Sequence, residues 1–124
     1  MAFPELSALR SRLASDRELA RCARYFTGAV HLGVGDAQFE VRFESGRVTA
    51  AGKADAPPGA RDLAISATAS EWEKLLAPVP PPFYQDPFGA SLHHPVSLGG
   101  EPETLFAYYP ALRRVIEILR KEKR

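Results

Sequence analysis

The sequence has one cysteine, three histidines and almost no net charge, and each scarcity argues against a class of function. Cys22 alone cannot form an internal disulfide, and one thiol with three histidines supplies no zinc-ligand cluster. Sixteen basic and fifteen acidic residues give a formal charge of +1, too little for a surface that binds nucleic acid or anionic membranes. No apolar run approaches the length of a membrane span, and the first residues lack the order of a signal peptide. We expect a cytoplasmic protein with no metal, no cofactor, no nucleic-acid partner and no membrane span.

The length and composition are those of one globular domain. At 124 residues, 45% of them hydrophobic and 25% charged, the chain can bury a single core. We expect residues 1–15 to form an N-terminal helical extension and residues 16–119 to form the core of the domain. Leu6, Leu9 and Leu13 recur at helical spacing, and Ser15 with Glu18 has the pattern of a capping box that restarts the helix.

The middle of the chain alternates apolar and polar residues with the period of a β-strand. The apolar members of this alternation are Val30, Leu32, Val34, Phe39, Val41, Phe43, Leu63 and Ile65. Glycine-containing turns at Gly35-Asp36 and Ser45-Gly46 separate the first three expected strands, and a Pro57-Pro58-Gly59 loop precedes the fourth. One face of the resulting sheet should therefore be buried and the other exposed to solvent.

A second series of helix signals follows the fourth expected strand. Thr68 with Glu71 forms another capping box, and it should start a short helix that carries Trp72. Asp86-Pro87 has the composition of a further helix start. Residues 91–98 are expected to form a fifth strand.

The sequence predicts two helices at the end of the chain, with Pro110 at the start of the second. Glu101-Pro102 is expected to start one helix. Pro110 is expected to start another, because a proline within a helix costs about 3 kcal/mol. The apolar residues that follow at helical spacing, Leu112 among them, should face the core.

This succession of elements resembles the sterol-carrier-like lipid-binding domains. The resemblance is carried by the segments 39–43, 44–48, 62–66, 71–76 and 89–100. It implies an α+β fold: a five-stranded, mostly antiparallel sheet with helices packed on one face and an apolar cavity beneath them. It also implies binding of a fatty acid, a sterol or an acyl-coenzyme A, or an accessory role beside an enzyme. The chain departs from the usual pattern at Gly99-Gly100-Glu101 and in the proline-rich stretch from Pro78 to Pro87.

The segment from Trp72 to Tyr109 concentrates aromatic residues among prolines, so it should either close the core or line a pocket. The candidate ligand-binding residues are Trp72, Phe83, Tyr84, Phe88, His93, His94, Leu105, Tyr108, Tyr109 and Leu112. If residues 91–98 form a strand, the two histidines point to opposite faces and only one can reach the pocket. We expect an apolar small-molecule ligand to bind there.

Two alternative functions remain open at this stage. The chain could be an accessory domain that forms a homodimer or binds a partner enzyme. It could also be a cofactor-free enzyme in which His93 or His94 acts as a base and Tyr84 or Tyr108 as a proton donor. No nucleophile elbow, phosphate loop or metal motif supports catalysis, so no catalytic residue is assigned.

Overall fold

A five-stranded sheet in the order β3-β2-β1-β4-β5 organises the computed structural model, which describes residues 3–122. The strands are β1 (Gly28–Val34), β2 (Ala37–Glu44), β3 (Arg47–Lys53), β4 (Leu63–Ala67) and β5 (Ser97–Gly99). β1 and β4 are parallel, and every other neighbouring pair is antiparallel. The predicted mostly antiparallel sheet of an α+β fold is therefore confirmed.

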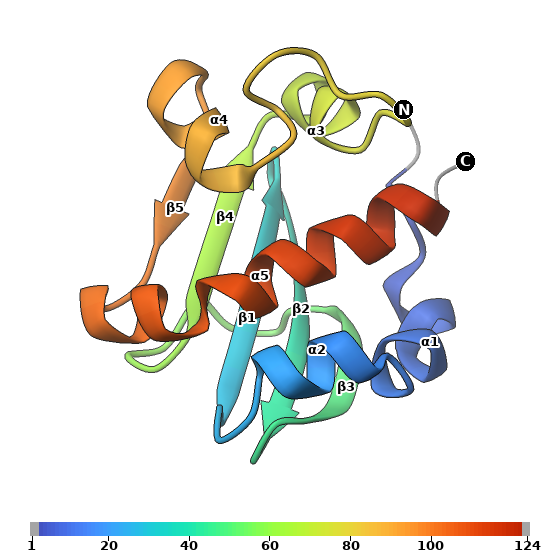
Figure 1. The fold of residues 1–124 in the computed structure, drawn as a ribbon, viewed down its shortest axis with the longest axis vertical. Helices are drawn as coiled ribbons and strands as arrows, with labels where there is room; N and C mark the ends of the chain where they lie inside the picture. Colours follow the sequence, from blue (N-terminus) through green and yellow to red (C-terminus); the bar gives the residue numbers. More distant parts are fainter. Residues whose placement is uncertain (1–2, 123–124) are drawn as a thin grey trace.

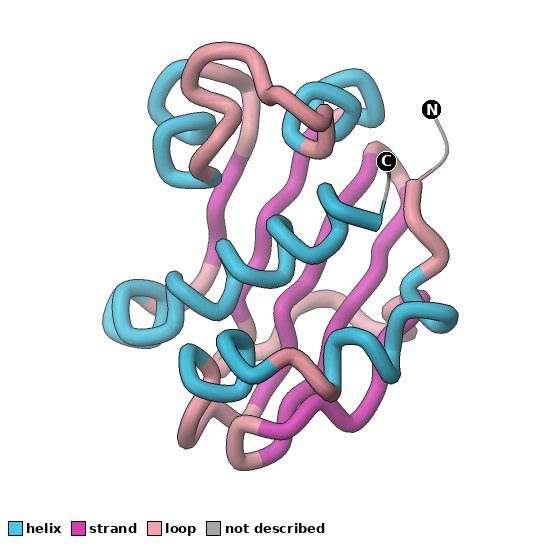
Figure 2. Tube along the Cα trace, turned by 45° about the vertical axis from the view of Figure 1, so that its right-hand side comes forward, coloured by secondary structure: helices cyan, strands magenta, loops and turns pink. Residues whose placement is uncertain are grey.

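The helices lie on one face of the sheet and at one of its ends (Figure 1). They are η1 (Leu6–Leu9), α1 (Arg10–Ala14), α2 (Arg17–Cys22), α3 (Ala69–Leu75), α4 (Pro87–His93) and α5 (Pro102–Glu122). Figure 2 shows α5 running diagonally across the sheet, with α2 beside it. α3 and α4 lie at the end of the sheet where β4 ends. Within residues 3–122, no helix lies on the opposite face of the sheet, and the connection between β3 and β4 crosses that face.

The core lies between the sheet and α5, where the period-two alternation predicted it. The predicted inward-facing residues all belong to this core: Val30, Leu32, Val41, Phe43, Leu63 and Ile65 are buried, and Val34 and Phe39 pack against them. From α5 the core receives Ala111, Leu112, Val115, Ile116, Ile118 and Leu119. Leu6 and Leu13 join the same cluster, so the N-terminal helical segment packs onto the domain.

One hairpin turn and two helix starts show why particular residues occur at these positions. Ser45 and Gly46, which join β2 to β3, have φ angles of 49° and 85°, the arrangement that a two-residue hairpin turn requires. At the start of α3 the Thr68 hydroxyl accepts a hydrogen bond from the Glu71 amide at 3.3 Å, as the capping pattern predicted. α2 differs from the prediction, because Asp16 rather than Ser15 caps it, by accepting a hydrogen bond from the Leu19 amide at 2.7 Å.

The predicted fifth strand is present, but its predicted bounds, residues 91–98, are wrong. The helix that starts at Pro87 continues to His93, and only Ser97–Gly99 pairs with β4. Pro95 explains where the helix stops, because a proline disfavours helical angles in the residue before it, and His94 is extended with φ −138° and ψ 166°. The opposite-face argument for the two histidines therefore does not apply.

The predicted helix start at Pro110 is also wrong. α5 begins at Pro102, with Glu101 accepting hydrogen bonds from the Thr104 amide and hydroxyl, and it continues through Pro110 to Glu122. Pro110 and Phe106, the residue one turn earlier, are both exposed. Proline has no amide hydrogen, so the Phe106 carbonyl receives no hydrogen bond from residue 110. This carbonyl lies on the solvent side of α5, where water can donate to it.

Candidate functional site

An apolar cleft of about 310 Å³ lies between α4, β5 and the first half of α5. Its walls are formed by Asp86, Phe88, Leu98, Leu105, Phe106, Tyr109 and Pro110. This volume is at the lower end of the range for small-molecule sites, which are typically apolar with a few polar groups. The three elements that form the cleft are drawn in orange at one side of Figure 1.

The cleft exists because the first half of α5 is not packed down on the sheet. Residues 102–110 include no buried side chain, whereas the buried face of α5 begins at Ala111. The neighbouring strand β5 is only three residues long and offers little surface for packing. Phe88 and Phe106 are consequently 46% and 71% exposed, although large apolar side chains are usually buried. These rings supply apolar surface that a ligand could cover.

One hydrogen-bonded group joins the two helices at the cleft. The Tyr109 hydroxyl accepts a hydrogen bond from the Phe88 amide at 2.9 Å and donates one to the Asp86 carboxylate. Burial, followed by the hydrogen bond to Asp86, raises the pKa of Tyr109 above its ordinary value, so its proton stays on the hydroxyl. Asp86 stands at the N-cap position of α4 but caps nothing with its side chain, which instead ties α4 to α5.

The structure brings three of the predicted site residues together in the cleft: Phe88, Leu105 and Tyr109. Sequence reasoning missed Asp86, Leu98, Phe106 and Pro110 as lining residues. Asp86-Pro87 and Pro110 had been considered only as helix starts. The spacing of Leu105, Phe106 and Tyr109 on one helix could have indicated a common face, but only with α5 continuous through Pro110.

Three other predicted residues lie in or against the core rather than in the cleft. Trp72 is fully buried, and its indole nitrogen donates a hydrogen bond to the Gly33 carbonyl at 2.7 Å. Leu112 is also fully buried, beneath α5. Tyr108 points away from Tyr109 and packs on Phe26, with ring centroids 4.9 Å apart.

The remaining predicted residues form an aromatic stack at the end of α4. The rings of Phe83 and His93 lie 3.8 Å apart, and those of Tyr84 and His94 lie 3.9 Å apart. Phe83 adopts a φ of 71°, which is unusual for a bulky side chain and presents its ring to His93. Neither histidine lines the cleft, so neither is placed to hold the head group of a ligand bound there.

A buried polar cluster that sequence reasoning missed lies on the helix-free face of the sheet. His31 is 2% exposed, and its Nε2 lies 2.9 Å from Oδ2 of Asp62. The same carboxylate accepts hydrogen bonds from the amides of Ala29 and Gly59. Burial opposes ionisation of Asp62, but these donors outweigh it and hold the carboxyl pKa below its usual range. The cluster anchors the loop that crosses this face.

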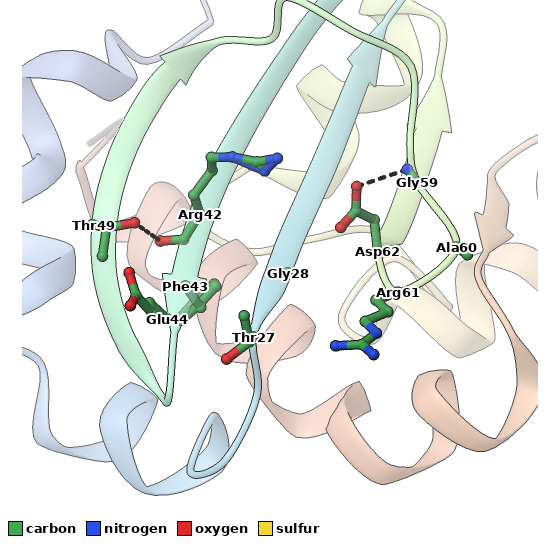
Figure 3. A pocket seen from close by; sticks show the side chains of 10 residues that line it. All are labelled: Thr27, Gly28, Arg42, Phe43, Glu44, Thr49, Gly59, Ala60, Arg61 and Asp62. Atoms are coloured by element: carbon green, nitrogen blue, oxygen red, sulfur yellow. Dashed lines mark hydrogen bonds between the residues drawn. The ribbon is translucent and has the colours of Figure 1, made fainter.

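A second, polar cleft of about 560 Å³ opens beside this loop (Figure 3). Its charged residues are Arg42, Glu44, Arg61 and Asp62, two of each sign. The side chains at its rim are exposed to water, and the Thr49 hydroxyl donates a hydrogen bond to the Arg42 carbonyl at 3.5 Å. Such a surface would not desolvate an apolar ligand, which leaves the smaller cleft as the better candidate.

Residues 3–122 contain neither a metal-ligand cluster nor a membrane-spanning helix. No group of three or more histidine, cysteine, aspartate or glutamate side chains in this part of the chain is arranged to hold a metal ion. No helix in the same range has both the length and the apolar character needed to cross a bilayer.

Comparisons with known proteins identify the fold. No protein-family model matches the sequence, and no curated protein matches it either. Among solved structures, sterol carrier protein 2 superposes with a TM-score of 0.74 at 18% identity, covering 97% of this chain and 98% of the other. A conserved hypothetical protein from Thermus thermophilus, described as a candidate sterol carrier protein, superposes with a TM-score of 0.71 at 17% identity. This match covers 98% of this chain and 89% of the other chain. A ubiquinone synthesis protein described as UbiJ-SCP2 superposes with a TM-score of 0.52 at 17% identity. This match covers 90% of this chain and 87% of the other chain. The chain therefore has the α+β fold of sterol carrier protein 2 over nearly its whole length.

Proposed function

We propose that this protein binds an apolar small molecule in the cleft between α4, β5 and α5. The observation that carries the proposal is a cleft of about 310 Å³ with walls that are apolar except at Asp86 and the Tyr109 hydroxyl. The exposed rings of Phe88 and Phe106 supply apolar surface at this cleft that a ligand could cover. The likeness to sterol carrier protein 2 agrees with this function, since that protein is named as a carrier of an apolar ligand.

The expected affinity is modest. An aliphatic chain that buries about ten methylenes gains on the order of 8 kcal/mol. Immobilising the ligand costs about 4 kcal/mol or more, which leaves at most about 4 kcal/mol and a dissociation constant of about 1 mM or weaker. Such affinity suits a carrier that must release its ligand as well as bind it.

The test uses dodecan-1-ol, a neutral probe that isolates the contribution of the apolar walls. We expect saturable binding, followed by the amide resonances of residues 86–109 in titrations monitored by NMR. Leu105→Ala, within the cleft, should weaken binding about tenfold because it removes roughly 1.4 kcal/mol of apolar contact. Val79→Ala is the matched control, because Val79 is 87% exposed and does not line the cleft.

Two results would contradict the proposal. One is the absence of saturable binding, and the other is an equal affinity of the wild type and Leu105→Ala. Native mass spectrometry of the purified protein provides an independent check, since a carrier can retain a lipid from the expression host.

A partner protein is the second candidate for the same site. Leu92, one turn after Phe88 on α4, is 66% exposed and extends the exposed apolar face of that helix. An apolar side chain of a second copy or of a partner enzyme could fill this surface. Failure of the probe to bind, together with a mass that rises with concentration in light scattering, would favour a homodimer.

A further inference from the structure

Asp86 gives the apolar cleft a single negative charge. Among the described residues that line the cleft, Asp86 alone is charged. Its Oδ1 accepts the hydrogen bond from Tyr109, and no described residue donates a hydrogen bond to its Oδ2. A carboxylate oxygen can accept more than one donor, so this group retains capacity to bind a donor on a ligand.

In the described part of the chain, no cationic side chain lines the cleft to compensate this carboxylate. Arg113 lies close enough to Tyr109 to oppose the rise in its pKa, but it does not line the cleft. Its side chain is 54% exposed, and its Nε lies 4.0 Å from the Glu117 carboxylate. His93 and His94, the candidate anchors for an acidic head group, stack on Phe83 and Tyr84 instead. A ligand carboxylate would therefore meet a like charge with no partner.

The aromatic residues at the cleft favour a ligand with a positive charge. Phe88, Phe106 and Tyr109 all contribute to its walls, and the rings of Phe88 and Tyr109 lie 6.4 Å apart in an edge-to-face arrangement. The faces of aromatic rings attract ammonium groups, and a carboxylate beside them adds a charged hydrogen-bond acceptor.

We propose that the cleft selects amphiphiles with a protonated amine as the head group and discriminates against free fatty acids. This inference rests on the proposed binding of an apolar molecule in the same cleft. The Asp86 carboxylate holds the ammonium group through Oδ2, and Leu98, Leu105 and the exposed phenylalanines cover the first part of the aliphatic chain. Asp86 is then the residue that determines head-group specificity.

The experiment compares three probes with the same twelve-carbon chain and different heads: dodecylamine, dodecan-1-ol and dodecanoate. Binding is measured by calorimetry at pH 7, below the concentrations at which the probes self-associate. The wild type should bind the amine about tenfold more tightly than the alcohol, and the alcohol more tightly than the carboxylate. The Asp86 carboxylate attracts the ammonium group, does not act on the neutral alcohol through charge, and repels the ligand carboxylate.

Asp86→Asn removes the charge while keeping an oxygen that can accept from Tyr109. It should reduce the preference for the amine over the alcohol to less than threefold and should leave binding of the alcohol nearly unchanged. Glu103→Gln is the matched control, because it removes an exposed acid on the first turn of α5 outside the cleft and should preserve the preference.

The outcomes separate this inference from the function on which it rests. Binding of the alcohol with no preference for the amine, or tighter binding of dodecanoate, overturns the inference and leaves the apolar-binding function standing. Failure of all three probes to bind overturns both. If Asp86→Asn does not fold, the order of the three affinities in the wild type still decides the question.

Discussion

Replacing Asp62 by alanine should remove most of the polar support on the helix-free face of the sheet. The carboxylate accepts hydrogen bonds from the Ala29 amide at 2.9 Å and the Gly59 amide at 2.7 Å, and it lies 2.9 Å from Nε2 of His31. The Ala29 amide and the His31 ring are buried, so the substitution leaves the amide without an acceptor and leaves His31 with only the Glu40 carboxylate, 3.9 Å from its Nε2. Gly59 is exposed, and water can replace the acceptor that its amide loses. Each buried polar group left unpaired costs about 1–3 kcal/mol.

We therefore expect Asp62→Ala to lower the free energy of unfolding by about 3–4 kcal/mol, a large part of the total for a small domain. Urea denaturation measures this loss as a lower midpoint with an unchanged slope. Asp55→Ala is the control, since Asp55 is an exposed acid in the same connection, and it should cost less than about 0.5 kcal/mol. A loss below about 1 kcal/mol for Asp62→Ala would refute the assignment of this cluster as the anchor of the crossing loop.

The same carboxylate makes stability depend on pH with a defined sign. The donors around Asp62 hold its pKa below the usual range, despite the opposing effect of burial. A carboxyl with a lowered pKa in the folded state stabilises the fold above its unfolded pKa of about 4. This stabilisation is lost as the pH falls through the lower, folded-state value. Asp62→Ala should therefore lose less stability between pH 5 and pH 2 than the wild type loses, and parallel curves would contradict the account.

Two further predictions concern α5. Pro110→Ala should raise the free energy of unfolding by roughly 1–3 kcal/mol, because alanine supplies the amide donor that is missing from the middle of this helix. Urea denaturation measures this change. A lower free energy of unfolding for the variant would argue against a continuous helix. Arg114 donates two hydrogen bonds to Asp16, and these bonds hold the pKa of that carboxyl below its usual range, so their stabilising effect should disappear as the pH falls below about 4. Asp16→Asn should reduce this acid sensitivity in thermal melts, and an unaltered pH profile would show that the ion pair contributes little.

The sheet could be predicted from the sequence because its signals are local. Alternation at Phe39, Val41 and Phe43 identifies both a strand and its buried face without reference to any other segment. The Thr68 cap and the Trp72 helix were also correct, since capping depends on residues three positions apart. Asp16 replaced Ser15 as a cap because neighbouring aspartate and serine can both fill this role, and the sequence does not decide between them.

The polar cluster could not be predicted, because its parts are far apart in the sequence. His31 and Asp62 are separated by 31 positions, and Asp62 comes at the end of an irregular connection with no periodicity to orient it. The candidate site was only partly predictable for a related reason. An apolar residue type indicates a tendency toward burial but does not tell a core position, such as Leu112, from a cleft position, such as Leu105.

The position of the cleft follows from the different packing of the two halves of α5. From Ala111 onward the helix buries a continuous face against the sheet, and a change there would open the core. Before Pro110 the same helix lies against the three-residue strand β5 and the short helix α4, so side chains there are held by few neighbours. Under the proposed function, substitutions at cleft residues such as Phe106 should therefore alter ligand preference at little cost to the fold. Structures that superpose closely at only 17–18% identity show that this fold is compatible with very different sequences.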